Sequence, residues 1–270
     1  MKYAVVFPGQ GAQEVGMGKG FFDRYAASRA VFERSDDALG FNLSRIIFFG
    51  PDDELKKTEY AQPAILAMSM AVFRCLEEEK GVVFSPEYVA GHSLGEYTAL
   101  VASEALSLED GLRLVHLRGK LMQEAVPLGV GSMAAVIGLD RESVISICES
   151  VSTLGVCQAA NFNAPGQIVI SGEKGAVDKA LALCKDAGAK RALPLKVSAP
   201  FHSCLMRPVA DQLRESFAQC EWKRPKWPLV ANVSAQEETD VGSIQEALFL
   251  QTFMPVLWSG SVEFIISRGV

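Results

Sequence analysis

Histidine is scarce in this sequence, since only His92, His116 and His202 occur among its 270 residues. A reaction that needs an imidazole as a general base must therefore use one of these three side chains. Long apolar runs are missing as well. The longest stretch without a charged residue, positions 151–172, contains Gln, Asn and Pro residues that are costly in hydrocarbon. We therefore expect no transmembrane segment and no membrane partner.

Paired cysteines and an excess of basic residues are also absent. The six cysteines include no C-x-x-C pair, so the sequence favours neither a zinc site nor a disulfide framework. The 26 Lys and Arg residues are outnumbered by 32 Asp and Glu, and the net charge of -6 argues against a nucleic acid partner. The apolar run at 3–7 ends at Pro8 and is too short for a signal peptide. These absences favour a cytoplasmic globular protein without a metal.

The first part of the chain alternates between short β-prone runs and long helical patterns. Residues 3–7 read as a buried strand that ends in the glycine-rich loop 8–13. The apolar spacing after Thr58 predicts a helix that stops at Gly81. This alternation is typical of an α/β domain.

A second long helix is predicted after Ser107. Ser107 and Asp110 resemble a capping box, and the apolar positions that follow recur at helical spacing. That spacing places Arg118 one turn before Met122. Taken alone, Arg118 can equally be a binding residue or an ordinary arginine on the solvated surface of a helix.

The middle of the chain follows a different rhythm, with shorter strands and helices. The order strand, helix, strand, strand, helix, strand is typical of a ferredoxin-like fold. The predicted elements span residues 133–137, 141–149, 156–161, 167–171, 177–187 and 192–197. Gly129 and Gly131 can act as a hinge, and we predict a subdomain of residues 129–198 inserted into a discontinuous domain of residues 1–128 and 199–270.

A serine in the context of a nucleophile lies at position 93. Residues 91–95 (GHSLG) match the pattern G-x-S-x-G, whose glycines allow a strained turn and a close approach of neighbouring backbone. The pattern alone is common, but here a predicted strand precedes it and a predicted helix follows it. That context exposes the serine hydroxyl and directs helix N-terminal N–H groups toward an anion. Ser93 is therefore predicted to be a nucleophile.

The base for this serine is sought among the three histidines. His92 is adjacent to Ser93 in sequence and would normally point away from it, and His116 lies within an apolar helix, where a structural role is expected. His202 follows a predicted strand, and Pro200 stiffens the turn that would hold its imidazole. A histidine with only a role in the turn remains the alternative.

Five segments together resemble the malonyl-CoA:acyl carrier protein transacylases, a family of acyltransferases that serves fatty-acid and polyketide synthesis. They are residues 8–13 (PGQGAQ), 91–96 (GHSLGE), Arg118, 161–167 (NFNAPGQ) and 198–203 (SAPFHS). The resemblance spans nearly the whole chain, with the segments in the family's order and spacing. It implies an α/β fold, with an α/β-hydrolase-like core around a parallel sheet and an inserted ferredoxin-like subdomain.

The resemblance also implies the catalytic roles. Ser93 would attack the thioester carbonyl of malonyl-CoA, and His202 would take its proton. The backbone N–H groups of Leu94 and Gln10 would bind the oxyanion. Gln251 would orient the histidine through its backbone carbonyl, where many hydrolases use an acid. A thiol leaving group has a pKa of about 8.5, so a weaker proton donor suffices.

Further residues are implied for the substrate. Arg118 would bind the free carboxylate of malonate through two parallel hydrogen bonds. Phe201 resembles the residue type of malonyl-selective members. Gln10, Gln62, Met122 and Asn161 are expected to line the same pocket. Gln62 is equally explained as a helix cap, and Asn161 as a residue that hydrogen-bonds a turn.

The expected reaction is transfer of malonyl to the phosphopantetheine thiol of acyl carrier protein for fatty-acid synthesis. A ping-pong mechanism through malonyl-serine is expected, with the coenzyme A thioester as substrate and no cofactor. An acidic carrier protein would need a basic docking surface on this acidic enzyme. The candidates are Lys185, Lys190, Arg191 and Lys196, and a solvated face is the alternative.

Two other functions remain open at this point. A serine hydrolase, such as a thioesterase, would share the serine turn, but it gives no reason for the loop 8–13 or for Arg118. A binding module without catalysis would not need a serine, a histidine and an arginine together.

The resemblance also implies elements that this sequence does not contain. The family continues past position 270 with a strand and a helix, so reduced stability or association through an exposed sheet edge is expected.

Overall fold

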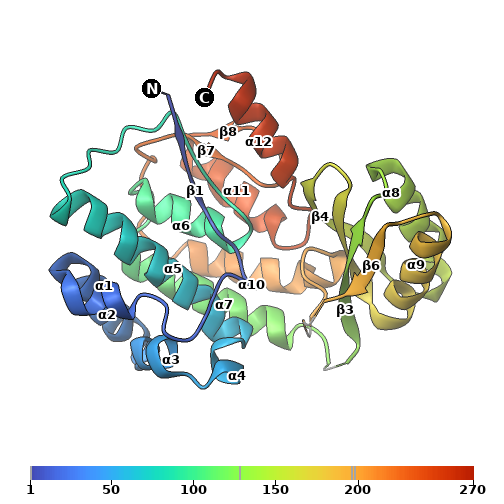
Figure 1. Cartoon of the computed structure of the whole chain (residues 1–270), viewed down its shortest axis with the longest axis horizontal. Coiled ribbons are helices and arrows are strands. Elements are labelled where there is room, and N and C mark those ends of the chain that lie inside the picture. Colours follow the sequence, from blue (N-terminus) through green and yellow to red (C-terminus); the bar gives the residue numbers. More distant parts are fainter. Residues whose placement is uncertain (1, 128, 196, 198) are drawn as a thin grey trace.

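The computed structural model describes residues 2–127, 129–195, 197 and 199–270. The described strands are β1 (Ala4–Phe7), β2 (Tyr88–Gly91), β3 (Gly131–Ile137), β4 (Cys157–Ala164), β5 (Gln167–Glu173), β6 (Arg191–Pro194), β7 (Leu229–Val230) and β8 (Glu237–Glu238). These strands form two sheets. The first contains β1 and lies among the long helices on the left of Figure 1, and the second contains β3, β4 and β6 and lies on the right.

Helices cover both sheets. The described α-helices are α1 (Lys19–Arg24), α2 (Ala26–Leu39), α3 (Leu43–Phe49), α4 (Asp52–Leu55), α5 (Thr58–Arg74), α6 (Leu94–Ala102), α7 (Leu108–Glu124), α8 (Arg141–Ser150), α9 (Lys174–Asp186), α10 (Arg207–Phe217), α11 (Val241–Gln251) and α12 (Trp258–Ser267). A π-helical turn, η1 (Cys75–Glu79), follows α5, and short 3-10 turns lie at η2 (Ser152–Leu154) and η3 (Cys204–Met206). The predicted helix from position 58 is thus confirmed as α5, with a change of helix type before Gly81.

The first sheet has the order β1-β2-β7-β8, in which β1, β2 and β7 are parallel and β8 is antiparallel to β7. Phe7 pairs with Gly91, so the carboxyl ends of β1 and β2 meet at one edge of the sheet. The predicted burial of the first strand is wrong. β1 has one strand neighbour, and its Val6 side chain is 52% exposed, because an edge strand is covered on fewer sides.

The helix that follows β2 lies at the centre of the larger core. Every residue of α6 is buried, whereas the long helices α5 and α7 pack through their apolar faces. The cap predicted for α7 is confirmed, since the Ser107 side chain accepts a hydrogen bond from the Asp110 N–H at 3.0 Å. The packing of α7 on α6 places the helix that carries Arg118 beside the helix that follows Ser93.

The second sheet is antiparallel, in the order β4-β5-β3-β6, with α8 and α9 packed against it. Its chain order is strand, helix, strand, strand, helix, strand, as predicted, and it has its own apolar cluster. The predicted strand 192–197 is shorter than expected, since β6 ends at Pro194, although the Leu195 N–H still donates to the Met133 carbonyl at 2.9 Å. Lys196 and Ser198 lie outside the described residues.

The two parts meet where β4 contacts the segment after α11. The Phe162 N–H donates to the Val256 carbonyl at 2.9 Å, and the Val256 N–H donates to the Ala160 carbonyl at 2.9 Å. These bonds hold the middle of β4 beside the end of α11. Asn161 and Gln251 are thereby brought to one region of the molecule.

Candidate active site

Ser93 occupies a sharp turn between β2 and α6, with φ 52° and ψ -103°. Close packing explains the glycines on both sides of it. A Cβ at Gly91 would lie 1.9 Å from the carbonyl carbon of Gly95, and a Cβ at Gly95 would lie 2.4 Å from the Phe7 oxygen. Only glycine fits at these two positions, so the predicted strained turn is present.

His202 faces this serine. Its Nε2 lies 2.8 Å from Ser93 Oγ, and its Nδ1 lies 2.8 Å from the Gln251 carbonyl oxygen. Because a carbonyl can only accept, Nδ1 carries the proton and Nε2 is free to accept one from the serine hydroxyl. Burial, followed by the nearby charge of Arg118, lowers the pKa of His202 to about 3. The imidazole is therefore neutral and able to act as a base.

Arg118 completes the group from α7. Its side chain is only 1% exposed, so the alternative of a surface arginine is wrong. Nη1 donates to Gln62 Oε1 at 2.8 Å, and Nη2 donates to Gln251 Oε1 at 2.9 Å and to Ser93 Oγ at 3.0 Å. Burial lowers the pKa of Arg118. Among the described residues these partners are all neutral, so the guanidinium remains available to an anionic group.

The residues expected at the oxyanion lie next to the serine. Leu94 is the first residue of α6, and Gln10 lies in the loop after β1. Gly9 lets this loop approach His92 closely, since a Cβ at Gly9 would lie 2.6 Å from the His92 backbone oxygen. No described residue accepts a hydrogen bond from the N–H of Leu94 or Gln10. Two backbone donors at one edge of the sheet suit an oxyanion.

A cavity of about 210 Å³ lies over these groups, between the two sheets. Of the ten residues predicted for the site, the cavity is lined by all except Gln251: Gln10, Gln62, Ser93, Leu94, Arg118, Met122, Asn161, Phe201 and His202. Gln251 lies directly behind it, bonded to His202 and Arg118. The helix-cap alternative for Gln62 is wrong, because this residue lies inside α5, and Asn161 lies in β4 rather than in a turn.

The other two histidines behave differently from each other. His116 Nδ1 lies 2.9 Å from the Glu59 carbonyl, which agrees with the structural role predicted for it. His92 lines the cavity, and its Nε2 lies 2.8 Å from Asn163 Oδ1. Burial lowers the pKa of His92. His92 therefore forms part of the cavity wall, a place that its sequence position did not predict.

Two further side chains support the serine and were not predicted. Asn232 Oδ1 accepts from the Ser93 N–H at 2.7 Å, and Glu96 is fully buried three positions after Ser93. Glu96 stands in the segment GHSLGE, but its sequence position does not reveal its partners. Asn232 is 139 positions from Ser93, so no local pattern could identify it.

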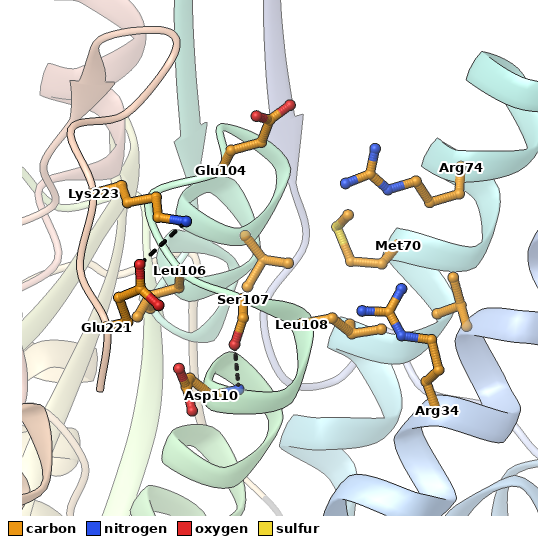
Figure 2. Close-up of a pocket in the computed structure, with 12 residues that line it drawn as sticks. Arg34, Met70, Arg74, Glu104, Leu106, Ser107, Leu108, Asp110, Glu221 and Lys223 are labelled. Carbon is orange, nitrogen blue, oxygen red and sulfur yellow. Dashed lines mark hydrogen bonds and ion pairs between the residues drawn. The ribbon is translucent and has the colours of Figure 1, made fainter. Parts of the chain in front are cut away.

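A second cavity, of about 330 Å³, opens elsewhere on the larger part of the molecule (Figure 2). Arg34 and Arg74 lie on one wall, and Glu221 and Lys223 lie on the other. These cations are occupied, since Arg34 pairs with Glu109, Arg74 with Glu77, and Lys223 with Glu221. The described residues that line this cavity include a serine, Ser107, but no histidine, so it does not compete with the site at Ser93.

The described residues contain neither a cluster suited to a metal nor a helix suited to a membrane. In the part of the chain that the structure describes, no group of three or more His, Cys, Asp or Glu side chains is arranged to hold a metal. Across the same residues, no helix has the length and apolar character needed to cross a membrane.

Comparison with known proteins agrees with this geometry. Residues 4–252 match the family model described as acyl transferase domain. The chain is 47% identical over 269 residues to the malonyl CoA-acyl carrier protein transacylase of Haemophilus influenzae, with 100% of this chain and 86% of that protein covered. It is 46% identical over 270 residues to the transacylase of the same name from Bacillus subtilis, with 100% and 84% covered.

Solved structures give the same result. The acyl-carrier-protein S-malonyltransferase of Bartonella henselae is similar with a TM-score of 0.98 and 49% identity, covering 100% of this chain and 86% of that one. A malonyl-transacylase in complex with its type II PKS acyl-carrier protein is similar with a TM-score of 0.96 and 46% identity, covering 100% and 87%. The chain belongs to the acyl transferase family, and similarity over its whole length places it with the malonyl CoA-acyl carrier protein transacylases.

Proposed function

We propose that this enzyme transfers malonyl from malonyl-CoA to the phosphopantetheine thiol of acyl carrier protein through a malonyl ester on Ser93. One observation carries the proposal. Ser93 Oγ lies 2.8 Å from a neutral imidazole nitrogen of His202 and 3.0 Å from Nη2 of a buried guanidinium, that of Arg118. The oxygen that would act as nucleophile therefore contacts both a base and a cation suited to a carboxylate.

The first half-reaction uses the histidine as base and then as acid. Ser93 Oγ attacks the thioester carbonyl carbon while His202 Nε2 takes the hydroxyl proton. The oxyanion accepts hydrogen bonds from the N–H groups of Leu94 and Gln10. When the carbon–sulfur bond breaks, the proton passes from His202 to the coenzyme A thiolate. The second half-reaction reverses these steps, with the pantetheine thiol of the carrier protein as nucleophile.

Arg118 selects the acyl group in this proposal. Its planar guanidinium suits a carboxylate, and its present partners are neutral amide and hydroxyl oxygens. An acetyl group would leave the buried cation without a bound carboxylate, at a cost of about 1–3 kcal/mol. Phe201 and Met122 line the cavity with apolar surface and limit the room for a branched acyl chain.

Transfer instead of hydrolysis requires that water is kept from the ester. The cavity lies between the two sheets and suits a thin pantetheine arm. The His202 ring is oriented by the Gln251 carbonyl, where a hydrolase pattern would expect an acid. We therefore favour a transferase over a thioesterase, with no cofactor besides the coenzyme A thioester. Fatty-acid synthesis is the process that the reaction is proposed to serve.

The proposal extends to the fold class, to the domain boundaries and to the cellular compartment of the protein. The order β4-β5-β3-β6 supports a ferredoxin-like subdomain, and the turn at Ser93 between β2 and α6 supports an α/β-hydrolase-like core. We keep residues 129–198 as the subdomain and residues 1–128 with 199–270 as the catalytic domain. All six cysteines are free thiols, which suits the reducing cytoplasm.

The carrier protein is proposed to dock on the subdomain. Lys185, Lys190 and Arg191 are exposed at the end of α9 and the start of β6. Their charges suit an acidic partner. The fourth predicted cation, Lys196, is outside the described residues and carries no part of this argument.

Mass spectrometry after mixing with malonyl-CoA tests the proposal. A malonyl adduct is expected on Ser93 of the wild type and should disappear in Ser93→Ala. Ser103→Ala is the control, because Ser103 is buried and donates to the Leu100 carbonyl, away from the cavity. An adduct that persists in Ser93→Ala, or release of free malonate faster than transfer to the carrier protein, would contradict the proposal.

A further inference from the structure

Glu96 is a buried carboxylate with no part in the mechanism described above. Its Oε2 accepts from Gln251 Nε2 at 2.9 Å and from the Asn232 N–H at 3.2 Å. Its Oε1 has no partner among the described residues. A carboxylate is costly to bury, so a fully buried one that holds two amide residues calls for a reason.

Asn232 and Gln251 hold the peptide groups on both sides of Ser93. Asn232 Oδ1 accepts from the Ser93 N–H at 2.7 Å, while its Nδ2 donates to the Gly91 carbonyl at 2.8 Å. Gln251 Nε2 donates to the Ser93 carbonyl at 2.8 Å. Ser93 has an unfavourable positive φ, which the surrounding bonds must hold in place. Both residues that do so share Glu96 as an acceptor.

The orientation of the Gln251 amide also matters for Arg118. Its Oε1 accepts from Arg118 Nη2 at 2.9 Å, and its Nε2 faces the Ser93 carbonyl and Glu96. If the amide turned over, its NH₂ would face the guanidinium and its oxygen would face two acceptors. Glu96 therefore favours the one orientation in which the Gln251 amide accepts from Arg118.

We propose that Glu96 is a positioning residue, which orients Gln251 and Asn232 and, through them, the hydroxyl of Ser93 and the guanidinium of Arg118. This inference rests on the roles proposed above for Ser93 and Arg118. Burial raises the pKa of Glu96 to about 7, against the opposing effects of its bonds to Gln251 and Asn232 and of the Arg118 charge. An oxygen at Oε2 accepts in both protonation states, so the amide oxygen of a glutamine can replace it.

The test compares Glu96→Gln with Glu96→Leu, which keeps a similar volume but offers no acceptor. The measured quantities are kcat, KM, the ratio of malonyl-CoA to acetyl-CoA activity, and Tm. Glu96→Gln should keep kcat within about threefold of the wild type. Glu96→Leu should lower kcat about 100-fold and reduce the malonyl to acetyl ratio at least about tenfold, because misplaced reacting groups lose this much. Thr98→Val, buried in the same helix, should change neither.

The double variant Glu96→Leu/Gln251→Leu tests the route through Gln251. Its loss should be close to that of either single variant, because both remove one connected set of contacts. Losses that multiply would overturn the inference. It would also be overturned if Glu96→Gln were as slow as Glu96→Leu with an unchanged malonyl to acetyl ratio, since that pattern indicates a role in folding alone.

Two outcomes separate this inference from the proposed function. A malonyl adduct that survives Ser93→Ala would refute the nucleophile, and with it both proposals. An adduct lost in Ser93→Ala, together with wild-type rates and selectivity in Glu96→Leu, would refute only the role of Glu96. Should Glu96→Leu fail to fold, Gln251→Leu alone must still lower the malonyl to acetyl ratio, and an unchanged ratio would overturn the inference.

Discussion

Replacing Arg118 by methionine should remove the preference for malonyl groups. The side chain is 1% exposed and donates to Gln62, Gln251 and Ser93, so methionine fills much of the same space without a charge. On the proposed binding mode, two N–H groups bind the malonyl carboxylate. A hydrogen bond to a charged group contributes about 1.5–3 kcal/mol, so losing both costs about 3–6 kcal/mol. That loss corresponds to a fall of about 10² to 10⁴ in kcat/KM for malonyl-CoA.

Acetyl-CoA is the informative second substrate. It has no carboxylate to lose, so its kcat/KM should fall less than about tenfold in Arg118→Met, the remainder reflecting the acceptor oxygens left without a donor. The assay follows acylation of the enzyme and transfer to a pantetheine thiol with both coenzyme A esters. Arg113→Met is the matched control, since Arg113 lies on the same helix with its side chain 58% exposed.

The result that would refute this reasoning is an equal loss with both substrates. In that case Arg118 would support the serine or the fold and would not select the carboxylate. Arg118→Lys gives a second check, because it keeps the charge but cannot form two parallel hydrogen bonds. It should retain part of the malonyl preference, and a complete loss would show that the charge alone contributes nothing.

Three further predictions concern pH, the serine turn and the carrier protein. Because the pKa of His202 is lowered to about 3, the base stays neutral as the pH falls from 7 to 5. The rate of Ser93 malonylation should therefore fall less than about threefold over this range. A fall of about 25-fold, as for an ordinary histidine of pKa about 6.5, would contradict this reasoning. Gly95→Ala should lower kcat by about 100-fold or more, because its Cβ would lie 2.4 Å from the Phe7 oxygen. Gly20→Ala is the control and should leave kcat unchanged, because no atom lies within 4 Å of its Cβ. Equal kcat values for the two variants would contradict the packing argument. Reversing the charges of Lys185 and Arg191 should raise KM for the carrier protein but not for free pantetheine, with Lys120→Glu as the control, and equal effects on both acceptors would contradict the docking proposal.

The features that sequence predicted well are local ones. The strand, turn and helix around Ser93 follow from a β-prone run, two glycines and an apolar helical pattern that all lie within residues 88–102. The scarcity of histidine also helped, because elimination among three side chains led to His202, whose Nε2 is 2.8 Å from the serine. The exposure of β1 was missed, because an edge strand and a central one share the same apolar pattern.

The supporting contacts could not be predicted in the same way. Glu96 stands in a segment that the sequence analysis singled out, yet its partners Asn232 and Gln251 lie 136 and 155 positions away. A family resemblance pointed to the backbone carbonyl of Gln251, but the side-chain amide that links Arg118, Ser93 and Glu96 is visible only in the fold. Such contacts depend on how α6, α7 and α11 pack, which periodicity does not determine.

The electrostatic behaviour of the site depends on this assembly. After burial, the charge of Arg118 is the next largest cause that lowers the pKa of His202, and the same guanidinium donates to Ser93 Oγ. On the proposed binding mode, a malonyl carboxylate offsets that charge, which makes the imidazole a stronger base when the acid-bearing substrate is bound. An acetyl group leaves the charge in place and the base weaker. Recognition of the acyl group and activation of the serine are then two effects of one buried cation, a coupling that neither the serine motif nor the arginine alone could indicate.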